Sequence, residues 1–140
     1  MTVTEANKAD NVNEILAHAC GADYMCRHPF GGQFSSGVEA VAAAADCFWL
    51  LDVVFSHQPR IKKEHPELWD FQVWKLSYNP GVEGGISEYW VVEAWSDTPD
   101  DEESTLLSKQ VLEYTDFPKE LMPFEELWLE GGTLILKGEH

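Results

Sequence analysis

Hydrophobic and polar positions change their spacing about halfway along the chain. In the first half, apolar residues recur at helical spacing within 11–21 (NVNEILAHACG), and Gly21 is a residue type that often follows the end of a helix. This pattern predicts a short amphipathic helix after a polar start. We expect the first ten residues to be flexible.

A second helical region follows the irregular, aromatic stretch 22–34. Ser36 and Glu39 match a capping box, in which a hydroxyl and a carboxylate satisfy free backbone N–H groups at the start of a helix. The apolar run that follows contains Asp46, which either bends one helix or separates two consecutive helices. The helical pattern ends before Pro59.

From Trp69 onward the residues are those typical of β-strands, rich in aromatic and β-branched side chains and bounded by turn-forming segments. The pair Gly131-Gly132 predicts a tight hairpin, because such a turn needs positive φ at both positions. Strands joined by short turns pair antiparallel. The strands are expected over 69–78, 87–96, 105–117, 125–130 and 133–138.

Together these elements predict an α+β fold. We expect two or three N-terminal helices, packed on one face of a roughly five-stranded and mainly antiparallel sheet. A length of 140 residues with 44% hydrophobic content is enough for one packed core, so residues 1–140 are expected to form a single domain.

The chain is strongly acidic, with 25 acidic and 9 basic residues and a net charge of −16. Such a surface repels phosphates, which argues against direct binding of nucleic acid or of an anionic membrane. Three interpretations of the acidity remain open: a solubilising surface, a surface for a basic partner that includes mimicry of nucleic acid, and a surface that binds cations.

The apolar runs and the cysteines indicate where in the cell the protein is expected. The chain has no apolar run long enough to span a membrane, and its first residues do not match a signal peptide. Its cysteines Cys20, Cys26 and Cys47 are odd in number and form no CxxC pair. We therefore expect a cytoplasmic protein with reduced thiols.

The stretch 46–58 contains Cys47, Asp52 and His57, the side-chain types of a cysteine hydrolase. On one helix these three side chains would point in different directions, whereas such a site needs them within hydrogen-bonding reach of one another. We therefore predict no catalytic residue here.

Asp52 lies among apolar residues in a helix that we expect to be central to the core. A buried carboxylate is costly unless it is paired. We predict that Asp52 pairs with Arg27 or His28 and so joins the irregular segment to the core helix. The same Arg27, His28 and Asp52 cluster could instead form a polar pocket.

Metal and cofactor sites are not predicted. Cys20, Cys26 and His28 have no standard zinc spacing, and the acidic turn 97–103 lacks the glycine and the ligand spacing of a calcium-binding loop. The sequence also lacks the glycine-rich motifs that bind nucleotide phosphates.

Tryptophans in the predicted strands suggest association. Trp90 and Trp95 have opposite parity in one strand, so they cannot both face the helices. Some aromatic surface should then lie on the other face of the sheet, where a partner commonly covers it. We predict a homodimer formed through this sheet surface or a strand edge, and another protein partner is an alternative.

A resemblance adds to this interpretation. The motifs that carry it are Tyr24, Arg27 and His28, then Ser36-Gly37-Val38, FWLLD at 48–52, FQVWKL at 71–76 and YTDFP at 114–118. In these motifs the chain resembles a family of small uncharacterised bacterial and phage-associated proteins, known only as a domain of unknown function. The resemblance implies no activity, but it suggests that Arg27, His28 and Asp52 belong to one feature.

Three functional hypotheses follow. The first is a non-enzymatic binding or accessory protein, associated with a phage or mobile element. The second is a small enzyme with a pocket at Arg27, His28 and Asp52. The third is an acidic mimic of nucleic acid, which needs the acids of 83–103 and 113–130 on one face.

Overall fold

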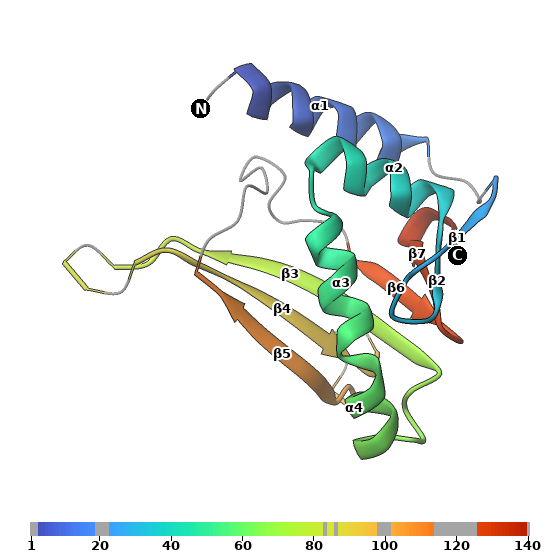
Figure 1. Cartoon of the computed structure of the whole chain (residues 1–140). Coiled ribbons are helices and arrows are strands. Elements are labelled where there is room, and N and C mark those ends of the chain that lie inside the picture. Colours follow the sequence, from blue (N-terminus) through green and yellow to red (C-terminus); the bar gives the residue numbers. More distant parts are fainter. Residues whose placement is uncertain are drawn as a thin grey trace.

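A computed structural model of the chain forms one mixed sheet with helices against it (Figure 1). The structure describes residues 3–18, 23–82, 84–85, 87–97, 102–113 and 126–139, and side chains from Ala9 onward. The helices are α1 (Val3–Ala17), α2 (Ser36–Ala45), α3 (Phe48–Ser56), α4 (Gln58–Glu64) and the 3-10 helix η2 (Lys137–Glu139). The strands are β1 (Met25–Arg27), β2 (Gln33–Ser35), β3 (Phe71–Asn79), β4 (Tyr89–Trp95), β5 (Leu106–Leu112), β6 (Leu127–Glu130) and β7 (Thr133–Leu136).

The predicted α+β class is confirmed, but the sheet differs from the prediction. It has seven strands in the order β1-β2-β7-β6-β3-β4-β5 instead of about five, and β2 pairs with β7 in parallel. The additional strands β1 and β2 lie in the stretch 22–34, between α1 and α2, so the helices do not all precede the strands. Each has only three residues, too few to show the alternation that identifies a strand.

The start of α2 was predicted one residue late. Ser35 is the N-cap, and its hydroxyl accepts a hydrogen bond of 3.1 Å from the backbone N–H of Val38. Ser36 is the first helical residue and its hydroxyl accepts from the N–H of Asp23 instead. Glu39 does not close a capping box, because Tyr24 and Cys26 hold its carboxylate.

Of the two alternatives at Asp46, the structure has two helices. Asp46 adopts φ 55° and ψ 48° and ends α2, and it is the only non-glycine residue with positive φ in the described ranges. Helix α3 ends at Ser56, ahead of Pro59, as predicted. A further helix, α4, follows with Pro59 in its first turn, where proline's missing N–H costs nothing.

The core lies between the helices and one face of the sheet. Helix α3 lies across β3 and β4 (Figure 1) and buries the apolar side chains Leu50, Leu51, Val53, Val54 and Phe55. Trp74 and Trp90 point to this face and are buried, whereas Trp95 and Trp128 lie on the opposite face and are half-buried. Trp69 precedes β3, so it is not a strand residue.

The hairpin between β6 and β7 is confirmed, with φ of 56° at Gly131 and 85° at Gly132. Other predictions fall wholly or partly outside the described residues: Gly21, the motif YTDFP at 114–118, and six of the fourteen acids required for the nucleic-acid mimic. No helix in the described part of the chain has the length and apolar character needed to cross a membrane.

Candidate functional site

The first candidate site is the cluster predicted at Arg27, His28 and Asp52. His28 is buried and its Nε2 lies 2.8 Å from Oδ1 of Asp52. Its Nδ1 accepts a hydrogen bond of 3.1 Å from the backbone N–H of Phe30, so Nε2 carries the proton that is donated to the carboxylate. The ring also stacks on Phe55 with centroids 4.6 Å apart. His28 is therefore held from every side and has no free nitrogen.

Asp52 differs from the prediction because it is not buried. Its side chain is 61% exposed. Phe48, Asp52 and Ser56 are spaced four residues apart and form one exposed stripe along α3. The sequence pattern did not predict this stripe, because Phe48 is apolar and was expected to be buried, whereas it is exposed.

Arg27 does not join the pair. It is exposed on β1, and no ion pair connects it with Asp52. It instead lines a shallow open groove of about 570 Å³. This turn groove is lined by Arg27, His28, Pro29, Gly31, Gly32, Gln33, Trp69, Gly131 and Gly132.

Close packing of two glycine turns forms the floor of the turn groove. Gly32 has φ +78°, and a Cβ there would lie 2.7 Å from a ring carbon of Phe55 and 2.9 Å from the carbonyl oxygen of Gly132. The backbone N–H of Gln33 also donates to that carbonyl, over 3.0 Å. The floor of the groove is therefore built from packed backbone.

Cys26 belongs to a second polar cluster. Tyr24 donates to Oε1 of Glu39 over 2.6 Å, and the Cys26 thiol donates to Oε2 over 2.9 Å. The hydrogen bond to Glu39 raises the pKa of Cys26, and the same carboxylate raises the pKa of Tyr24. The bonds from Cys26 and Tyr24 lower the pKa of Glu39. A thiol held protonated is a poor nucleophile and a poor metal ligand.

The candidate zinc ligands do not form a site in the described residues. Cys20 lies outside them, and both ring nitrogens of His28 are already bonded. Within the described ranges no group of three or more His, Cys, Asp or Glu side chains is arranged to hold a metal ion. Asp52 and His57 diverge as predicted, because Asp52 bonds to His28 and His57 bonds to strand β5.

The contact of His57 with β5 was not predicted. Its Nδ1 lies 2.6 Å from the Ser108 hydroxyl and its Nε2 lies 2.7 Å from Oε1 of Gln110. A serine bonded to an oriented histidine resembles a nucleophile with its base. However, Arg60 also donates to the Ser108 oxygen, and Ser108 is only 6% exposed. The cluster therefore locks the α3–α4 junction onto β5. Its only sequence signal is that Ser108 and Gln110 share one strand face.

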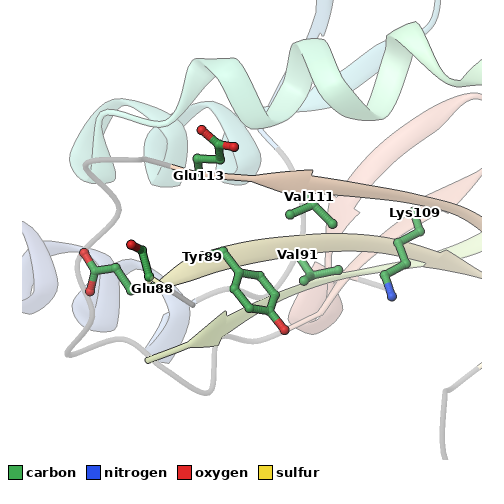
Figure 2. A pocket seen from close by; sticks show the side chains of 7 residues that line it. Glu88, Tyr89, Val91, Lys109, Val111 and Glu113 are labelled. Atoms are coloured by element: carbon green, nitrogen blue, oxygen red, sulfur yellow. The ribbon is translucent and has the colours of Figure 1, made fainter. Parts of the chain in front are cut away.

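The second candidate site lies on the sheet face opposite the helices. There β4 and β5 form an open groove of about 850 Å³, which we call the sheet groove (Figure 2). Val91 and Val111 are partners across the two strands at its centre, and Val111 is 55% exposed. The residues that line the sheet groove are Ser87, Glu88, Tyr89, Val91, Lys109, Val111 and Glu113.

Charge is distributed unevenly along the sheet groove. Lys109 is the one base among the lining residues and lies at one end, whereas Glu88 and Glu113 lie at the other end (Figure 2). Strand β5 is also the last strand of the sheet, so in the described part of the chain no strand pairs with its outer edge. The site therefore combines an apolar centre, opposite charges at its ends and a strand edge that can accept another strand.

Comparisons with known proteins give a family and no function. A family described as a family of unknown function (DUF6876) matches residues 10–140. Its coverage confirms the resemblance to a domain of unknown function. No curated protein matches the chain, and no solved structure matches it.

Proposed function

The chain belongs to DUF6876, a family of unknown function, and from its own surfaces we propose that it acts by binding another protein and not by catalysis. The binding site is the sheet groove together with the outer edge of β5. The observation that carries the proposal is this seven-residue edge strand, whose Val111 is 55% exposed beside an open groove.

Strand addition is the mode of binding that this site supports. The outer edge of β5 presents backbone N–H and C=O groups without a strand partner in the described residues, and an extended segment can pair with them. Backbone hydrogen bonds then supply affinity, while the groove selects the side chains that point into it. Val91 and Val111 offer an apolar contact, and the charges at the two ends fix the direction of the added strand.

A non-enzymatic role is supported by the state of the reactive side chains. His28 and His57 have both ring nitrogens in hydrogen bonds, and the hydrogen bond to Glu39 keeps the Cys26 thiol protonated. A general base or nucleophile must also reach the substrate, whereas His28 and the Ser108 partner of His57 are buried. We extend the proposal to an accessory role in a phage or mobile element, which the resemblance in the motifs supports. Neighbouring phage or defence genes are expected, and a metabolic gene cluster would contradict this extension.

Photo-crosslinking tests the binding site. Benzoylphenylalanine is placed at Val111 in one variant and at Val82 in a matched variant, because Val82 is 69% exposed but does not line the sheet groove. On irradiation in cells that produce the protein, we expect a crosslinked product from position 111 and none from position 82. Equal products from both positions, or none from position 111, would contradict the proposal.

A further inference from the structure

We infer that the partner is a second copy of this chain, whose β5 pairs antiparallel with β5 about a two-fold axis at Val111. This inference rests on the proposed function and names the partner of the same site. A two-fold axis between two antiparallel strands places one residue opposite its own copy and pairs the others symmetrically around it. Which residue lies on the axis fixes every other contact.

The charges of β5 select the residue on the axis. With Lys109 on the axis, two ammonium groups would face each other, which is destabilising. With Gln110 on the axis, Lys109 would face Val111 and Glu113 would face Leu107. With Val111 on the axis, Val111 faces Val111 and each Lys109 faces Glu113 of the other copy. This last register is the one that joins opposite charges and also buries the exposed valine.

The side-chain directions agree with this register. Lys109, Val111 and Glu113 alternate with Ser108, Gln110 and Leu112, so they share the face of the sheet groove. Pairing therefore places the two grooves side by side on one continuous sheet. The two-fold axis also exchanges the ends of the groove, which brings the basic end of one copy toward the acidic end of the other.

Lys109 is available for this contact. Its neighbour on β4 is Glu93, but no ion pair of Lys109 occurs within the described residues. A lysine on an edge strand ordinarily discourages pairing. Here Lys109 and Glu113 each lie two residues from Val111, so with Val111 on the axis each lysine faces a glutamate of the other copy. Lys109 therefore favours this register and disfavours registers in which it has no opposite charge to face. This selectivity matters because two chains of net charge −16 repel each other at long range.

Sedimentation equilibrium of the full chain tests the inference. We expect the wild type to form a dimer. Lys109→Glu and Glu113→Lys should each raise the dimer dissociation constant about tenfold, because each places like charges opposite one another at two symmetric positions. The double variant K109E/E113K should restore dimerisation, since the opposite charges are only exchanged. Lys137→Glu, at an exposed position on η2, is the matched charge control and should have a smaller effect than Lys109→Glu.

Cysteine crosslinking tests the register separately. Only a residue on the two-fold axis lies opposite its own copy, so Val111→Cys should form an intermolecular disulfide under mild oxidation and Lys109→Cys should not. The wild type, with its native cysteines, is the control for other crosslinks.

Several results would overturn the inference: a monomeric wild type, a double variant as weak as the single variants, or crosslinking at position 109 in place of 111. The photo-crosslink at Val111 keeps the two proposals apart. A product with twice the mass of the chain supports the dimer, and a product of another mass would overturn the dimer while leaving the binding function in place.

Discussion

The two members of the His28–Asp52 pair should contribute unequally to the stability of the fold, because the histidine is buried and the carboxylate is exposed. His28 contributes a ring stacked on Phe55 and an acceptor for the Phe30 N–H, both removed from water. Asp52 contributes one hydrogen-bond acceptor at a position where water can replace it. The histidine should therefore contribute most of the stability of the pair.

Two substitutions measure this asymmetry. His28→Ala should lower the free energy of unfolding by about 2–4 kcal/mol, because it removes the packed ring and leaves a backbone N–H without its acceptor. Asp52→Asn should lower it by less than about 1 kcal/mol, because the amide oxygen can still accept from Nε2. Urea titration measures both. Equal losses for the two variants would show that the carboxylate charge itself is required.

The Glu39 cluster predicts the reactivity of Cys26. Because the pKa of Cys26 is raised by its hydrogen bond to Glu39, the thiolate fraction at pH 8 is smaller than for an ordinary cysteine. Alkylation by iodoacetamide should therefore be slow, and Glu39→Gln should accelerate it several-fold and move its pH profile to lower pH. Cleavage after Tyr24 separates Cys26 from Cys20, so mass spectrometry can follow each thiol. An unchanged rate in the variant would show that Glu39 does not control the thiol.

The two edge strands of the sheet, β1 and β5, differ in how well they are protected against pairing with another strand. Strand β1 has three residues, and Cys26 and the neighbouring Tyr24 are bonded to Glu39 on α2. Strand β5 has seven residues and carries the exposed Leu106 and Val111. A short edge tied to a helix offers little to another strand, whereas a long exposed edge is a template for pairing. This contrast places the proposed interface at β5.

The contact between the two glycine turns should make one glycine far less replaceable than its neighbour. Gly31→Ala introduces a side chain at φ +101° with nothing within 4 Å, so it should cost about 1 kcal/mol from backbone strain alone. Gly32→Ala adds the clash with Phe55 and with the carbonyl of Gly132, so it should cost about 3 kcal/mol or more. Thermal or urea unfolding of the two variants gives the difference. Equal costs would mean that the turns do not pack as described.

Local patterns predicted the elements that have a local cause. Strands β3 and β4 were recognised from aromatic and β-branched residues between turn signals, and the hairpin from Gly131-Gly132. The parallel pairing of β2 with β7 joins residues 33–34 to residues 133–134, and no local pattern specifies it. The pairing of His28 with Asp52 was predicted because a buried carboxylate needs a partner, although Asp52 is in fact exposed. The sheet groove could not be predicted in this way, because it depends on strand order and on which edge of the sheet remains open.

For the whole molecule, the net charge of −16 opposes compaction, because folding brings the acids closer together. Raising the salt concentration from 0.01 M to 1 M shortens the screening length from about 30 Å to about 3 Å, which weakens this repulsion. We expect the free energy of unfolding to rise by about 1–2 kcal/mol between the lowest and the highest salt concentration. The measurement is urea unfolding in sodium chloride at a fixed protein concentration, since the proposed dimerisation would also stabilise the folded state.

The control for this salt series is the same experiment at a lower pH, where the acids take up protons and the net charge falls. Salt should then stabilise the protein less, because less repulsion remains to be screened. A stability that falls as salt is added at neutral pH would mean that attraction between charges outweighs repulsion. In that case the acids would be arranged for favourable contacts within the fold, and the acidity would no longer support a surface that is only solvated.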